Sequence, residues 1–106
     1  MIKFVVILHK KPGMTTPEFC SYLTNIHGPL ALKLPGLRRY VQNFVVNDGK
    51  RLHPGWDAMV ELYFDDRTSM EAAWETCEGQ ASDADLPLFL DIERTSWSIV
   101  EEAVLL

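Results

Sequence analysis

The 106-residue chain has the length of one domain, and its 47% hydrophobic and 24% charged residues are typical of an ordinary globular protein. A net charge of −5 disfavours nucleic-acid binding, which requires a basic surface, and no apolar stretch approaches the length of a membrane span. The two cysteines have no CxxC or Cys/His spacing, which predicts reduced thiols in a cytoplasmic protein and no metal site.

The chain opens with a predicted strand and helix. Residues Ile2–Leu8 form a continuous β-branched and apolar run, which indicates a strand buried on both faces. Thr16 can then cap a helix, since Pro17 suits its first turn and apolar residues continue at helical spacing to about Ile26. We expect Gly28-Pro29 to interrupt this helix, because both residues are poor in a helix interior.

The middle of the chain predicts two strands. One more helical turn over 30–34 leads to a second strand over Leu37–Val46. A loop with Asn-Asp-Gly turn chemistry occupies 47–55, and Trp56–Phe64 forms the third strand, with apolar residues at every even position.

A second helix and a last strand complete the pattern. Thr68 and Glu71 fit a Thr-x-x-Glu capping box, and Gly79 marks a predicted helix end. A short helical segment over 82–90 is followed by a strand within 93–105. The order βαββαβ predicts one α+β domain over residues 1–106, with a ferredoxin-like four-stranded antiparallel sheet. Helices then cover one sheet face only, so we expect a homodimer to cover the other.

Five sequence blocks resemble those of a known family. The chain resembles the EthD family over nearly its whole length. The resemblance is carried by Lys11-Pro12-Gly13, His27-Gly28-Pro29-Leu30-Ala31, Leu34-Pro35-Gly36-Leu37-Arg38-Arg39-Tyr40-Val41-Gln42-Asn43, Trp56-Asp57 and Phe89-Leu90-Asp91.

The resemblance implies a dimeric α/β barrel and a link to bacterial oxygenase systems that degrade ethers. Related domains of this barrel type act as cofactor-free monooxygenases, cyclases, dehydratases and lactone isomerases, and the family is often labelled oxidoreductase. The chain has no Gly-rich dinucleotide loop and no haem or flavin motif, so we expect no cofactor.

His27 is the leading catalytic candidate. It lies near the end of the first predicted helix, where an imidazole that titrates near neutral pH can move a proton on a substrate. The alternative is a helix C-terminal His that only satisfies the last carbonyl groups and the helix dipole.

Four other residues are expected around the same cleft. Tyr40 can place a phenol there as a hydrogen-bond donor or acid, and the alternative is a packed Tyr with a satisfied hydroxyl. His53 is placed near the substrate by similarity to lactone isomerases of this barrel type, although a solvated loop His is the competing interpretation. Trp56 and Trp74 are expected to form apolar walls for substrate binding, or to belong to the core.

These residues favour a small enzyme that carries out acid/base or oxidoreductase chemistry on a small hydrophobic or aromatic molecule. The alternative hypothesis is a non-catalytic accessory protein that binds an intermediate or a partner oxygenase component. A third possibility is a dimeric scaffold whose pocket is filled by bulky side chains such as Trp56, Trp74, Phe64 and Phe89.

Overall fold

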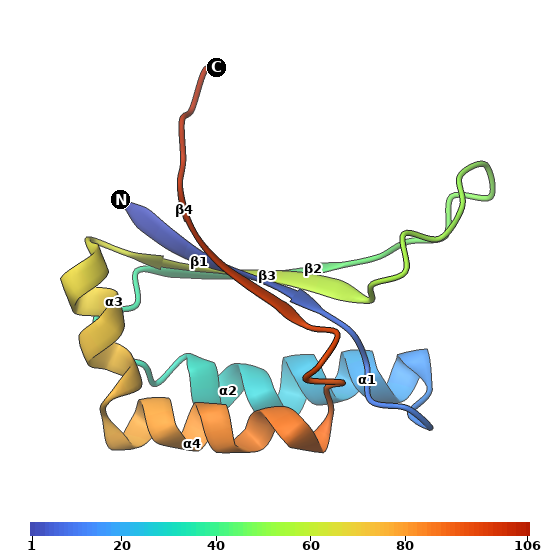
Figure 1. The fold of residues 1–106 in the computed structure, drawn as a ribbon, viewed down its shortest axis with the longest axis horizontal. Coiled ribbons are helices and arrows are strands. Elements are labelled where there is room, and N and C mark those ends of the chain that lie inside the picture. Colours follow the sequence, from blue (N-terminus) through green and yellow to red (C-terminus); the bar gives the residue numbers. More distant parts are fainter.

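The computed structural model describes residues 1–106 as one antiparallel sheet with helices on one face (Figure 1). Its strands are β1 (Ile2–Leu8), β2 (Arg39–Phe44), β3 (Ala58–Phe64) and β4 (Ser96–Glu101). They lie in the order β2-β3-β1-β4, and every neighbouring pair is antiparallel. Together with the two helical crossovers, this order is the ferredoxin-like α+β fold that the sequence predicted.

The N-cap of the first helix lies one residue earlier than predicted. Thr15, not Thr16, is the N-cap of α1 (Thr16–Tyr22), because its hydroxyl accepts from the Glu18 amide while the Glu18 carboxylate accepts from the Thr15 amide. This reciprocal pair satisfies two amides that a helix start leaves open.

The expected interruption at Gly28-Pro29 is wrong. The chain continues from α1 through a π-helical turn, η1 (Leu23–His27), into α2 (Gly28–Ala31). The Gly28 amide donates to the Leu23 carbonyl, five residues back. Pro29 then lies in the first turn of α2, where its missing N–H removes no bond within that helix.

The second helical region contains two helices and a 3-10 turn, where the sequence predicted a helix ending at Gly79 and a short helical segment over 82–90. Asp66, not Thr68, caps α3 (Arg67–Trp74), since its carboxylate accepts from the Ser69 amide at 2.7 Å. Thr76 starts the separate helix α4 (Cys77–Asp85), and Gly79 lies inside its first turn. A 3-10 turn, η2 (Leu86–Leu88), follows directly and leads towards β4.

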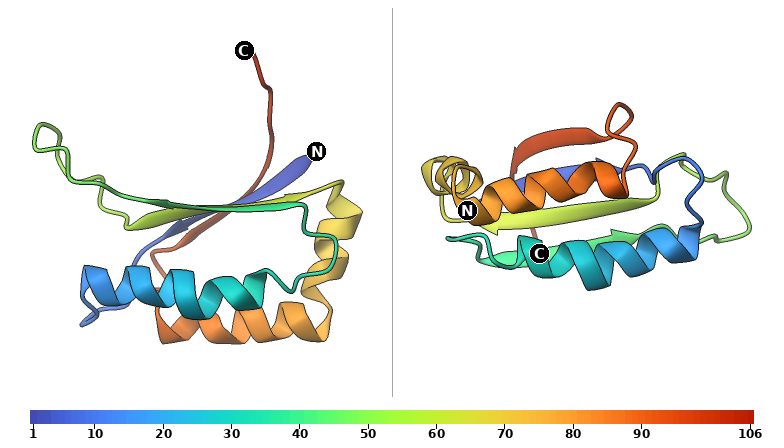
Figure 2. Two further views of the ribbon diagram at one scale, coloured as in Figure 1. Left: turned by 180° about the vertical axis from the view of Figure 1, so that it is seen from behind. Right: turned by 90° about the horizontal axis from the view of Figure 1, so that it is seen from below.

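Helices α1, α2 and α4 lie in a layer under the sheet, while the opposite sheet face carries no helix (Figure 2). Strand alternation sends Tyr40 and Gln42 of β2 towards the helices and Val41 and Asn43 towards the uncovered face. No helix of the structure is both long and apolar enough to cross a membrane.

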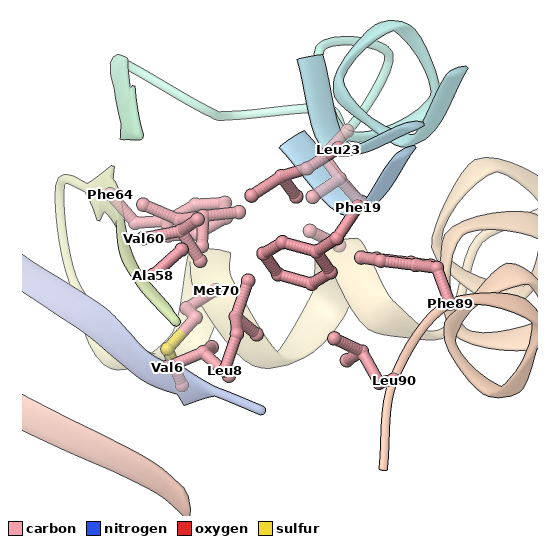
Figure 3. Packing of buried hydrophobic residues seen from close by; sticks show 13 residues of the cluster. Val6, Leu8, Phe19, Leu23, Ala58, Val60, Phe64, Met70, Phe89 and Leu90 are labelled. Carbon is pink, nitrogen blue, oxygen red and sulfur yellow. The ribbon is translucent and has the colours of Figure 1, made fainter. Parts of the chain in front are cut away.

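Thirteen buried apolar residues form the core between sheet and helices (Figure 3). Phe19, Phe64, Phe89 and Leu23 are its largest fully buried members. Burial of each such side chain contributes about 1.5–3 kcal/mol, so these contacts fix the helix layer against the sheet. The Phe19 and Phe89 rings lie 6.0 Å apart and join α1 to the segment after η2.

Candidate functional site

A cavity of about 280 Å³ lies between the sheet and the helices. Its walls come from all four strands and from η1, α2, α3, α4, η2 and the residue after it, and 12 of its 15 lining residues are hydrophobic. The polar members are His27, Ser82 and Asp83, and the phenol of Tyr40 also lines it. The apolar walls are Phe4, Val6, Leu8, Leu23, Ala31, Val60, Leu62, Trp74, Leu86, Phe89 and Trp97. The space is therefore open and is not filled by bulky side chains.

His27 is the polar group held most firmly at this cavity. It is 7% exposed, its ring lies 4.9 Å from that of Phe89, and its Nδ1 lies 3.0 Å from a carboxylate oxygen of Asp85. A carboxylate only accepts, so Nδ1 carries the ring proton and Nε2 presents a lone pair. Nε2 has no partner within the chain, which leaves this lone pair free for a ligand.

The pKa of His27 reflects two opposing effects. Desolvation lowers it below its usual 6.5, because burial penalises the imidazolium. The hydrogen bond to Asp85 and the charges of Asp85 and Asp83 raise it by a smaller amount. Above that lowered pKa the ring is neutral, so His27 is a base at neutral pH. Its pairing with Asp85 also stabilises the imidazolium that forms once it takes a proton.

Tyr22 shares this carboxylate. Its hydroxyl donates to the second Asp85 oxygen at 2.7 Å, and this bond raises the pKa of Tyr22 to about 12. Neither Tyr22 nor Asp85 was a candidate site residue from the sequence alone. Tyr22 belongs to the apolar helical pattern, and Asp85 is one of several acids in a helical stretch, so neither carried a visible signal.

The hydroxyl of Tyr40 is oriented by Gln42. The Gln42 amide nitrogen donates to the Tyr40 oxygen at 3.0 Å and to the Leu23 carbonyl at 3.0 Å, and its amide oxygen accepts from Thr24. Since Tyr40 accepts here, its own proton is free to be donated into the cavity. Desolvation raises the pKa of Tyr40, so the phenol stays protonated at neutral pH.

The other expected site residues fall in two groups. Trp74 lines the cavity, where its ring lies 5.5 Å from that of Phe4. His53 lies in the exposed β2–β3 loop, where its Nδ1 accepts from the Gly55 amide at 3.1 Å, and Trp56 is half-buried beside it. Neither His53 nor Trp56 is among the lining residues of this chain's cavity.

The EthD domain family model matches residues 11–93. This chain belongs to the EthD family. The match includes His27, Tyr40 and Asp85, so these three residues lie within the EthD domain. A comparison with curated protein sequences gave no match.

Solved structures agree with this assignment. A crystal structure of an EthD family protein from Bacillus halodurans is 30% identical, covers 97% of this chain and 100% of its own, and has a TM-score of 0.81. A dimeric ferredoxin-like protein of unknown function from Thermobifida fusca is 14% identical, with 95% and 90% covered and a TM-score of 0.75. SnoaB, described as a cofactor-independent oxygenase from Streptomyces nogalater, is 13% identical, with 98% and 95% covered and a TM-score of 0.66. The last two likenesses show the fold alone.

Proposed function

We propose that this EthD domain is a cofactor-free enzyme that moves a proton on a small hydrophobic or aromatic molecule. His27 is the general base and Tyr40 the hydrogen-bond donor. One observation carries the proposal: His27, with a free Nε2 lone pair, and Tyr40, with a free hydroxyl proton, line the same apolar cavity.

The chemistry follows from these two groups. A C–H bond beside a carbonyl breaks, its proton forms an N–H bond at Nε2 of His27, and the electron pair moves onto the carbonyl oxygen. Tyr40 donates a hydrogen bond to that oxygen as it becomes negative, and Asp85 balances the imidazolium. Apolar walls exclude water and strengthen both interactions. Return of the proton to another carbon of the enolate gives an isomerisation. If the enolate carbon instead forms a bond to a second carbonyl carbon of the same molecule, whose oxygen takes the proton, the result is a cyclisation. If a β-hydroxyl group takes the proton and leaves as water while a C=C bond forms, the result is a dehydration.

The comparisons support this proposal at the level of the fold. SnoaB is described as a cofactor-independent oxygenase, so a chain of this fold works without a bound cofactor. Deprotonation by a protein base would also be the first step of such an oxidation, since an electron-rich carbanion or enolate reacts with oxygen more readily than its parent.

The test needs no knowledge of the natural substrate. β-Tetralone is a neutral bicyclic ketone with acidic hydrogens beside its carbonyl, and proton NMR in deuterated buffer measures their exchange. We expect the protein to accelerate exchange over buffer. His27→Ala should lower the catalysed rate by about 10²–10⁴-fold and Tyr40→Phe by about 10²-fold or more.

Tyr63→Phe is the matched control. It removes a phenol on the other sheet face, where the hydroxyl donates to Glu102 at 3.0 Å, and it should leave exchange unchanged. If the protein binds β-tetralone but exchange in wild type equals that in buffer, the enzyme proposal fails. The domain would then be an accessory protein that binds an intermediate or an oxygenase component.

We propose further that the domain acts as a cytoplasmic homodimer joined through the uncovered sheet face. That face presents half-buried apolar side chains, Val5, Ile7, Val41 and Met59, which no element of the chain covers. The chain after β4 also leaves the sheet on this side, with Val104–Leu106 exposed (Figure 1). The Thermobifida fusca protein of the same fold is described as dimeric, which supports the arrangement. The two cysteines are free, as expected in a reducing compartment.

A further inference from the structure

The charged groups around the cavity are all acidic. None of the lining residues is Lys or Arg. Asp83 is a lining residue that is exposed to solvent, so its carboxyl group lies at the opening of the cavity. A second carboxylate, that of Asp85, lies 3.0 Å behind Nδ1 of His27. A ligand in the cavity therefore meets one carboxyl at the opening and another behind the base.

A ligand anion would be poorly stabilised in this position. It would lose its hydration among walls that are hydrophobic at 12 of 15 residues, and no cation lines the cavity to replace that hydration. His27 cannot supply the missing charge at mildly alkaline pH, since desolvation holds its pKa below 6.5. The carboxylates of Asp83 and Asp85 add repulsion.

A ligand cation is also disfavoured. Both oxygens of Asp85 are already engaged, one by the Tyr22 hydroxyl and the other by His27. The exposed Asp83 carboxylate attracts an ammonium group only weakly, which offsets a small part of the hydration that this group loses among the apolar walls. The remaining polar group, the Ser82 hydroxyl, is neutral.

We propose that this cavity selects uncharged ligands, and that Asp83 is a specificity-determining residue which rejects carboxylate-bearing molecules at the opening. The inference rests on the proposed function only in taking this cavity as the substrate site. The substrate class is then a neutral hydrophobic molecule with an acceptor oxygen for Tyr40, such as a lactone, a ketone or a phenol. Free acids and phosphate esters lie outside it.

Isothermal titration calorimetry with three naphthalenes of matched size tests whether the cavity prefers uncharged ligands. They are β-naphthamide, which is neutral, β-naphthoate, which is its isosteric anion, and β-naphthylmethylamine, which is a cation. At about pH 8, where His27 is neutral, we expect the amide to bind at least about tenfold more tightly than the carboxylate and more tightly than the amine.

Variants locate the effect at Asp83. Asp83→Asn should narrow the preference for amide over carboxylate by about threefold, and Asp83→Lys should narrow it by about tenfold or more. Glu78→Gln removes an exposed carboxylate from the same helix, away from the cavity, and should leave the ratio unchanged.

Several outcomes overturn the inference. The first two are binding of the carboxylate as tight as that of the amide or tighter, and binding of the amine tighter than that of the amide. The other two are no saturable binding of the amide, and a ratio of amide to carboxylate affinity that stays the same in the Asp83 variants. Because the assay reads affinity and not turnover, its result is independent of the exchange experiment on His27. A charge preference without proton exchange would keep this inference and remove the enzyme proposal.

Discussion

Tyr22 and His27 hydrogen-bond the same carboxylate although they are five residues apart in one helical segment. In a regular α-helix, residues five apart point about 140° away from each other. The π-helical turn over Leu23–His27, closed by the Gly28 amide on the Leu23 carbonyl, brings both side chains to one face. The local departure from α-helical geometry therefore builds the support for the proposed base.

This arrangement predicts the effect of Asp85→Asn. The amide keeps only one acceptor oxygen for two donors, and its nitrogen can donate to His27 and reverse the ring tautomer. We expect stability to fall by about 1–3 kcal/mol and β-tetralone exchange to fall by about 10²-fold or more. Nitrogen-15 NMR of the His27 ring reads the tautomer directly. If Nδ1 remains the protonated nitrogen and exchange is unchanged, Asp85 has no positioning role.

The lowered pKa of His27 predicts a specific acid dependence of stability. Below the usual pKa of 6.5 the unfolded chain takes up a proton that the folded ring resists, so the free energy of unfolding decreases as pH falls. As the pH falls, this loss of stability begins near pH 6.5 and levels off below the pKa that His27 has in the folded protein. Asp65 and Glu61, whose pKa values are lowered from 3.8 and 4.5, lose their contribution only at more acidic pH.

Urea unfolding between about pH 7.5 and 5 measures this dependence. His27→Gln should flatten the curve in this interval, because it removes the titrating ring and keeps a donor for Asp85. The explanation through His27 fails if both proteins lose the same stability across this interval. Asp83 is a carboxyl group at the same cavity whose pKa is raised from 3.8 mainly by desolvation, so Asp83→Asn is the second variant to compare.

The four strands, though not all their bounds, followed from short-range patterns. A continuous apolar run predicted the β1 bounds, and alternation placed Tyr40 and Asn43 on opposite faces of β2. The resemblance to lactone isomerases of this barrel type, not alternation, pointed to Tyr40 as a residue of the cavity that it lines. The partners of the two polar groups could not be predicted in this way. Asp85 reaches His27 across 58 positions of sequence, and the π-turn breaks the 3.6-residue period on which helix patterns depend. The Gln42 bridge needs the helix and β2 to be packed together first.

Two helical glycines, Gly79 and Gly28, should differ in how much stability the protein loses when each is changed to Ala. At Gly79 a Cβ would lie 2.6 Å from the Trp74 Cα and would also collide with the Ala73 carbonyl, all backbone that cannot move aside. Gly79→Ala should therefore destabilise the protein by about 2–3 kcal/mol or more. At Gly28 the Cβ would lie 3.1 Å from the Leu23 carbonyl oxygen, a tight contact but not a collision, and 3.2 Å from the Gln42 amide nitrogen, which is a side-chain end and can shift.

For Gly28→Ala, the gain of about 1 kcal/mol in helix propensity offsets most of the clash, so stability should change by less than about 1 kcal/mol. The displaced Gln42 no longer orients Tyr40, and β-tetralone exchange should fall by about tenfold. Thermal unfolding and the exchange assay on both variants separate the two effects. The proposed role of Gln42 is contradicted if Gly28→Ala is fully active.

If the uncovered sheet face forms the homodimer contact, a charged substitution on this face should separate the dimer into single chains. Val41 lies on this face of β2, directly across from Glu61 of β3, so a Lys at this position finds a carboxylate beside it within the same chain. Val41→Lys should leave the folded chain intact but place a charge in the sheet-on-sheet contact, where the loss of its hydration is costly even beside Glu61.

Sedimentation equilibrium should give twice the chain mass of 12.1 kDa for the wild type and a mass near that of one chain for Val41→Lys. Leu32→Lys is the matched control, because Leu32 is 65% exposed at the end of α2, on the helix side of the sheet. It should stay dimeric. A wild type that sediments as a single chain at micromolar concentration would contradict the homodimer. The half-buried apolar face of β1 and β2 would then belong to a contact with a different protein.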